Sequence, residues 1–225
     1  VSIPKGLIMF KSINFKSEVL KNIIVLTSGT VMAQLVAYLL TPVITRLYTP
    51  DESAELGLFI RIVGVGAALA TARYELALPV TRLDQHSFRL YRFALRITLI
   101  TSLITLIALI YPILLSDNIS IMLFYAAIPI SVALNAFNNL GTNWAVRMKR
   151  FRIISYSKMS NSIISNLSKV LFGILNFGYI GLILGTVIGL VFSVIFFFRD
   201  FRFTNSTFKI SRNSPRNYLL AKEYI

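Results

Sequence analysis

Ionisable residues inside long apolar runs are the side chains whose chemistry would be most unusual in this sequence. Arg61, Arg73, Glu75, Arg96 and Lys169 each lie within a stretch of mostly aliphatic residues. A charge near the middle of a bilayer costs at least about 2.5 kcal/mol unless it is paired, reaches the interface or faces water. These residues therefore mark either buried ion pairs or a hydrated path for a polar solute.

Their positions along the runs separate these five residues into three groups. Arg61 and Arg96 are expected close enough to span ends for their long side chains to reach the headgroups. Lys169 is expected near mid-span, which predicts a buried ion pair or a place on a hydrated cavity. Arg73 and Glu75 are two residues apart, so in a helix they point away from each other. They are either interfacial anchors or parts of a charged functional site.

Three of the runs also carry uncharged polar residues at helical spacing, so each stripe occupies one helix face. In chain order the stripes are Thr30, Gln34, Tyr38 and Thr41; Asn135, Asn138, Asn139 and Thr142; and Ser162, Asn166, Lys169 and Gly173. Such faces must turn away from lipid, toward other helices or toward an internal aqueous space. Interhelical hydrogen bonds and a solute path both remain open as explanations.

Glycines recur every fourth residue in the last apolar run, at Gly181, Gly185 and Gly189. Small residues at this spacing let a neighbouring helix backbone approach closely. We therefore predict that these glycines serve helix packing.

Six runs have roughly the 20 residues that a helix needs to cross the hydrocarbon core. They cover about 22–44, 56–80, 93–115, 119–145, 160–177 and 179–198, and a basic tail follows at 199–225. The runs are too long, and alternate too little, for barrel strands. We expect an all-α membrane protein with one domain, a polytopic bundle of six transmembrane helices.

Basic residues alternate from one connection to the next. They gather before the first run, in the second and fourth connections and after the sixth run, whereas the other connections hold Arg46 beside Asp51, Glu52 and Glu55. Cytoplasmic connections are enriched in Lys and Arg. This alternation predicts a multi-pass protein of the cytoplasmic membrane with both termini inside.

Several functional classes find little support in the composition. The chain has no cysteine and one histidine, which argues against thiol catalysis, metal sites and enzymes in general. The net charge of +14 is distributed in short clusters between apolar runs, so membrane lipids rather than nucleic acid are the expected partners. No cofactor is expected.

The sequence contains four short motifs: Thr45-Arg46-Leu47-Tyr48-Thr49-Pro50, Gly57-Leu58-Phe59, Arg73-Tyr74-Glu75-Leu76-Ala77 and the Gly178–Gly189 region. They resemble motifs of the Wzx-type oligosaccharide flippases, within the multidrug/oligosaccharidyl-lipid/polysaccharide flippase superfamily. The segment Asp51–Leu56 lacks the aromatic residue that the family usually has there. The resemblance implies the amino-terminal lobe of a twelve-helix transporter, with a second six-helix lobe in a longer chain or a partner.

By the same resemblance, the protein would move undecaprenyl-diphosphate-linked oligosaccharide repeat units across the bacterial inner membrane, for O-antigen or related surface polysaccharide. Arg73 and Lys169 would supply positive potential, and Glu75 would balance charge or couple an ion. Asn135, Asn138, Asn139 and Gln34 would line the substrate path. Two alternatives stay open: an ion-coupled small-molecule or drug antiporter of the same superfamily, and a truncated fragment without transport activity.

Overall fold

The computed structural model describes residues 6–80, 84–116 and 118–212, and these residues form α-helices and one short 3-10 helix, without strands. The helices are α1 (Gly6–Leu47), α2 (Pro50–Ala70), η1 (Tyr74–Ala77), α3 (Asp84–Leu115), α4 (Ile119–Arg147), α5 (Phe151–Ile174) and α6 (Tyr179–Arg212). Five of the described helices, all but α5 and η1, are long and apolar enough to cross a membrane. The chain is therefore a helical, multi-pass membrane protein, as the composition predicts.

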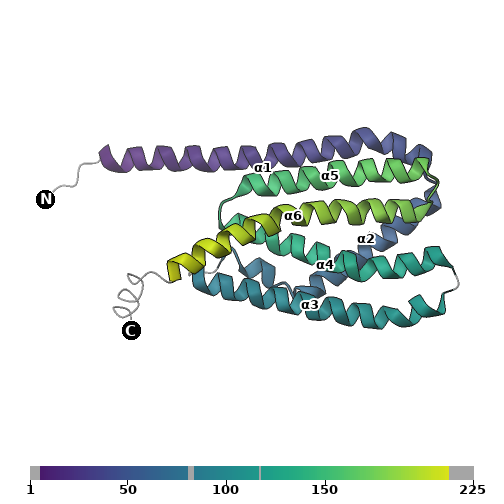
Figure 1. The fold of residues 1–225 in the computed structure, drawn as a ribbon. Coiled ribbons are helices and arrows are strands. Elements are labelled where there is room, and N and C mark those ends of the chain that lie inside the picture. The colour runs from purple at the N-terminus through teal and green to yellow at the C-terminus, as the bar shows by residue number, and fades with distance from the viewer. Residues whose placement is uncertain (1–5, 81–83, 117, 213–225) are drawn as a thin grey trace.

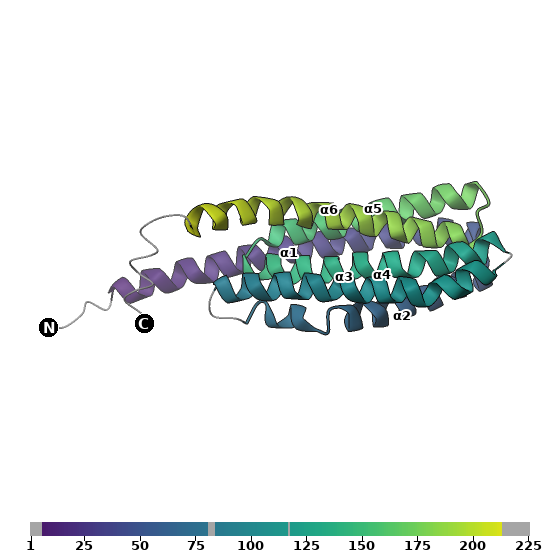
Figure 2. The ribbon, with the colours of Figure 1, turned by 60° about the horizontal axis from the view of Figure 1, so that its bottom comes forward.

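The long helices pack side by side, and their directions alternate along the chain (Figure 1). α1 lies on α5, α5 on α6 and α6 on α4, while α2 and α3 both pack against α4. One end of the bundle carries the connections rich in arginine and lysine, including Arg147, Lys149 and Arg150, and is called the basic end below. The other, the acidic end, carries Asp51 and Glu52. At the basic end, α1 and α6 extend beyond their neighbours (Figure 2).

The bounds of α2 correct the predicted span 56–80. Thr49 caps the helix, because its Oγ1 accepts from the Glu52 backbone N–H at 3.3 Å while the Thr49 N–H donates to Glu52 Oε2 at 2.7 Å. Pro50 then occupies the first turn, where its missing N–H costs nothing. The helix ends at Ala70, since Ala72 and Arg73 adopt positive φ angles of 45° and 58°.

The bounds of the other helices agree with the sequence to differing degrees. α4 closely matches the predicted span 119–145, and Asn118 caps it by accepting from the Ser120 N–H at 2.9 Å. α1 and α3 contain the predicted spans 22–44 and 93–115 but begin earlier. Because nothing breaks either helix at the edge of its apolar run, each continues into polar sequence.

The last two helices differ more from the prediction. α5 begins before the predicted span 160–177 and ends at Ile174, after which Asn176 and Gly178 have φ angles of 57° and 60°. α6 continues past 198 to Arg212, so the first part of the predicted tail is helical, while residues 213–225 lie outside the described residues. α5 is long enough to span but less apolar than the others, so a count of six spans stays a prediction.

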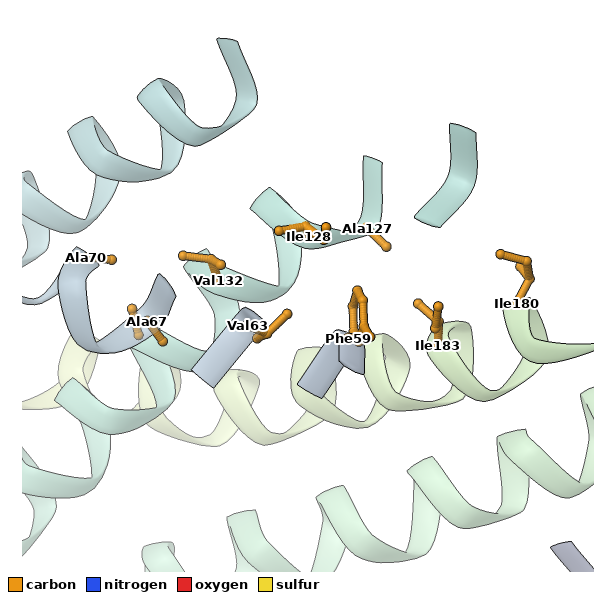
Figure 3. Packing of buried hydrophobic residues seen from close by; sticks show 10 residues of the cluster. Phe59, Val63, Ala67, Ala70, Ala127, Ile128, Val132, Ile180 and Ile183 are labelled. Carbon is orange, nitrogen blue, oxygen red and sulfur yellow. The ribbon is translucent and has the colours of Figure 1, made fainter. Parts of the chain in front are cut away.

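The main apolar core lies where α2, α4 and α6 meet (Figure 3). Phe59, Val63 and Ala67 of α2 interdigitate with Val132 of α4 and Ile183 of α6, and all five are buried. A Cβ at Gly66 would lie 2.7 Å from Val132 Cγ2, so this glycine admits Val132 between α2 and α4. The core thus fixes the positions of three helices, two of which, α4 and α6, carry predicted site residues.

Candidate functional site

The contact between α1 and α5 determines which flank of α1 is left uncovered. Ser155 Oγ donates to the Val25 carbonyl at 2.8 Å, and Ser162 Oγ donates to the carbonyl of Ala33. Closer to the acidic end, a Cβ at Gly173 would lie 3.0 Å from Leu47 Cβ. Val25, Ala33 and Leu47 therefore mark the line along which α1 contacts α5.

The polar stripe of α1 lies beside this contact line. At about 100° per residue, Gln34 and Thr41 are turned roughly a third of a turn from it, and Tyr38 nearly half a turn. All three are exposed, Tyr38 to 78%, and the Thr41 hydroxyl donates to the Ala37 carbonyl of its own helix at 2.7 Å. Within the described chain α1 packs extensively against α5 alone, so this polar flank has no covering helix.

Lys169 lies on the face of α5 between its contact with α1 and its contact with α6. Around α5, residues that face α1, such as Ser162, and residues that face α6, such as Ser165, are separated by less than a quarter of a turn. Lys169 falls between them, and its Cγ would lie 2.7 Å from a Cβ at Gly185. Its backbone carbonyl accepts from Tyr48 Oη at 2.7 Å.

The corrected bounds of α5 also change the depth of Lys169. The residue is five positions before the helix ends at Ile174, which corresponds to about 7.5 Å along the axis. It therefore lies toward the acidic end of α5, rather than at the middle of the span as the sequence predicted.

The polar flank of α1 and Lys169 lie on one side of the helix array. α1 and α5 run in the same direction (Figure 1), so the right-handed helical repeat fixes the side of their shared plane on which each residue lies. By this repeat, Gln34, Tyr38 and Lys169 lie on the side that also holds α6. We call this the inner side and the opposite one the outer side.

The asparagines of α4 extend the inner side. Val132 marks the face of α4 that contacts α2, and Gly141, whose Cβ would meet the ring of Phe197, marks the face that contacts α6. Asn135 and Asn139 lie between these two faces and are partly exposed. Asn138 is nearer to α6, where its Oδ1 accepts from Ser193 Oγ at 3.1 Å. The stripe thus combines one interhelical hydrogen bond with amides turned toward the gap between α2 and α6.

Arg61 is a site residue that the sequence reasoning missed. With α2 at Pro50–Ala70, Arg61 lies at the middle of the helix, where reaching either interface is hardest. It is exposed and turned about half a turn from Val63, hence away from α4. A Cβ added at Gly57 or Gly64 of the same helix would meet no atom within 4 Å. The Thr49-Pro50 and Glu52 cap was the signal that could have placed Arg61 at mid-depth.

Arg73 and Glu75 lie outside regular α-helix. Arg73 is exposed in a left-handed conformation after α2, and Glu75 belongs to the 3-10 helix η1 near the basic end. The Glu75 side chain is only 2% exposed, and its Oε2 has no hydrogen-bond partner among the described residues. Arg73 and Glu75 are therefore far along the bundle from Lys169, so these three charged residues form no single cluster.

The three glycines of α6 lie along its contact with α5. A Cβ at Gly181 would meet Phe172 Cβ at 2.8 Å, and one at Gly189 would meet Ser165 Cβ at 2.6 Å. Together with Gly185 they allow the two backbones to approach closely. This approach holds Lys169 against α6.

The site as a whole offers amides, hydroxyls and cations at several depths on one side of a membrane protein. No group of three or more His, Cys, Asp or Glu side chains that could hold a metal ion occurs in the described part of the chain. The amides and hydroxyls of the site can take part in hydrogen bonds, and its cations can attract anions. The chain matches no family model, no curated protein and no solved structure.

Proposed function

We propose that this chain forms one lobe of a bacterial flippase that moves undecaprenyl-diphosphate-linked oligosaccharide repeat units across the cytoplasmic membrane for O-antigen or related surface polysaccharide. The observation that carries the proposal is the gathering of polar and cationic residues from three helices on the inner side, with an exposed arginine at the middle of a fourth. The inner-side residues are Gln34 and Tyr38 of α1, Asn135 and Asn139 of α4, and Lys169 of α5, and the arginine is Arg61 of α2.

The distribution of the cations fits a diphosphate that moves through the membrane. Arg73 lies near the basic end, Arg61 at mid-depth and Lys169 toward the acidic end. A dianionic group could therefore keep a cationic neighbour along the path, which lowers the cost of leaving water. The asparagine amides can both donate to and accept from sugar hydroxyls. The polyprenyl chain would remain in lipid beside the lobe.

The uncovered inner side supports the expectation of a second six-helix lobe. A polar flank such as that of α1 is costly against lipid, so a facing lobe that encloses water would satisfy it. Rocking of two lobes about an enclosed site gives alternating access. In this proposal all six long helices span the membrane, and the basic end is cytoplasmic because it carries the arginine and lysine clusters.

Glu75 is the best candidate for coupling transport to an ion. A carboxylate that is 2% exposed with an unpartnered oxygen is costly in its charged form. Binding a proton or a metal cation there would remove that cost. We propose that this residue exchanges an ion during the transport cycle.

Gene deletion and complementation in the native host would test the function. Deletion should abolish surface polysaccharide and accumulate its lipid-linked precursor, and the intact gene should reverse both. The substitutions Arg61→Gln and Lys169→Gln should each reduce export at unchanged membrane abundance.

Arg46→Gln is the matched control for these variants. Arg46 is an exposed arginine near the acidic end, on the outer flank of α1, so its loss should leave export intact. Normal polysaccharide in the deletion strain would overturn the flippase proposal. Hypersensitivity to toxic cations in that strain, with normal polysaccharide, would instead favour a drug antiporter.

A further inference from the structure

A groove of about 410 Å³ lies between α1 and α5 near the basic end. Its floor is the close contact of Gly29 with Ser155, where the absence of a side chain on Gly29 brings the helices together. Longer side chains rise on either side of this contact, including Met32 from α1 and Arg152 and Met159 from α5. The groove therefore results from two small residues surrounded by large ones.

The groove opens on the outer side of the array. Ser28 and Met32, which line it, lie on the flank of α1 opposite to Gln34 and Thr41. Further along the same flank come Leu39 and Val43, both exposed and apolar. The groove thus faces lipid rather than the proposed substrate path.

Its chemistry changes with depth. Arg152, in the first turn of α5, is exposed and makes no hydrogen bond or ion pair with the described residues. One turn deeper, the ring of Tyr156 is 57% exposed, and helix side chains lean toward the amino terminus, which here is the basic end. Met32 and Met159 form the deeper apolar part of the groove. None of the described residues that line it carries a carboxylate.

We propose that this groove binds the phosphate headgroup of an anionic phospholipid. The phosphate contacts the Arg152 guanidinium and the hydroxyl of Tyr156, while an acyl chain follows Met32 and Met159 toward the bilayer centre. The groove extends from Arg152 to Met159, about 10 Å along α5, which matches the depth from headgroup to upper acyl chain. The flexible methionines adapt to a chain of irregular shape.

Native mass spectrometry of the full chain, released from bilayers of phosphatidylcholine with a minor fraction of phosphatidylglycerol, would test this site. We expect one retained phosphatidylglycerol per chain. Arg152→Gln should weaken its retention at least about tenfold, because a hydrogen bond to a charged group is lost.

The matched control is Lys149→Gln, which removes one positive charge from the same connection but outside the groove. General attraction to an anionic surface predicts at most about a fivefold loss for that variant. Equal losses in Arg152→Gln and Lys149→Gln would overturn the site.

A variant that fills the groove tests whether lipid binding depends on the shape of the groove and not only on its charge. Ser28→Trp keeps every cation, and it should displace the lipid while size-exclusion profile and melting temperature stay unchanged. Retention of phosphatidylglycerol by Ser28→Trp would also overturn the proposal. The site does not depend on the flippase function, since binding is measured without transport.

Discussion

Two helix contacts in this molecule are built in different ways. Where α5 meets α1 and α6, small residues bring backbones together and hydroxyls bridge them: Ser155 to the Val25 carbonyl, and Ser157 Oγ to Ser193 Oγ at 2.6 Å. Where α2 meets α4 and α6, apolar side chains such as Phe59 and Val132 interdigitate. The first contact is bridged by polar groups, and the second is formed by apolar side chains.

The difference shows how the bilayer acts as a solvent. Lipid is as apolar as leucine, so packing apolar side chains against each other gains close contact but no transfer from water. A polar helix gains more by turning its hydroxyls inward, because lipid offers them no partner. α5, the least apolar of the long helices, accordingly lies between two neighbours, whereas α2 contacts α4 and α6 through apolar side chains.

Removing Phe59, the largest buried side chain of the α2–α4–α6 core, should have the largest effect. Phe59→Ala leaves a cavity between α2, α4 and α6, and should lower the free energy of unfolding in detergent by about 3 kcal/mol, the low end for soluble cores because the transfer term is small here. Denaturant titration followed by circular dichroism would measure it. Ile60→Ala, at an exposed neighbour, should cost little; equal losses would show that Phe59 packs no better than a lipid-facing residue.

Adding a methyl group tests how closely the backbones of α5 and α6 approach each other. Gly185→Ala places a Cβ 2.9 Å from the Lys169 backbone nitrogen, so α5 and α6 must move apart at a cost of about 1 to 3 kcal/mol. Gly64→Ala, where no atom lies within 4 Å, should be neutral or slightly stabilising. The same unfolding titration compares the pair. A stable Gly185→Ala would mean that α5 and α6 are not in close backbone contact.

Removing a single interhelical hydroxyl should lower the free energy of unfolding less than either of these two changes. Ser157→Ala removes the buried hydrogen bonds to Ser193 and should cost about 0.6 kcal/mol, the typical value for such bonds in membrane proteins. Thr105→Val is the control, since its hydroxyl donates to the Thr101 carbonyl of its own helix at 2.8 Å. Combining Ser157→Ala with Ser193→Ala should cost less than the sum of the single changes if the two hydroxyls act as a pair.

The change expected to alter the free energy of unfolding least at neutral pH is at Tyr48, whose side chain joins the α1–α2 connection to α5. Burial, and secondarily the charge of Glu52, raise the pKa of Tyr48 from 10.0 to about 12. The folded state favours the neutral phenol, so this stabilisation is complete below pH 10 and is lost as the pH rises through about 12. In an ultraviolet titration of phenolate formation, Tyr48→Phe should remove the phase near 12; loss of a phase near 10 instead would contradict the burial of this hydroxyl.

Local signals predicted the helical class and some boundaries well. Asn118 before a long apolar run sets the start of α4, and the glycine spacing in α6 predicts close packing. The prediction for α2 was wrong because the acidic residues after Pro50 suggested a loop, although Thr49 and Glu52 cap a helix there. That shift concealed Arg61 as the mid-depth cation.

The common side of the polar stripes could not be predicted from sequence. Periodicity shows that Gln34 and Tyr38 share a face, but only the contacts of α1 with α5 show which way that face turns. The same holds for Asn135 and Asn139, whose direction depends on where α2 and α6 pack against α4. Such relations involve helix pairs distant in the chain, so no local pattern contains them.

The modest apolarity of α5 also has a consequence for how the protein is made. Lys169, Asn166 and several serines give α5 little tendency to leave the translocation channel for lipid on its own. Only the short connection 175–178 separates it from the strongly apolar α6, so the two can enter the bilayer together as a helical hairpin. Nascent chains that end before α6 should therefore leave α5 only partly inserted, to be retained or degraded by the quality-control machinery of the cell.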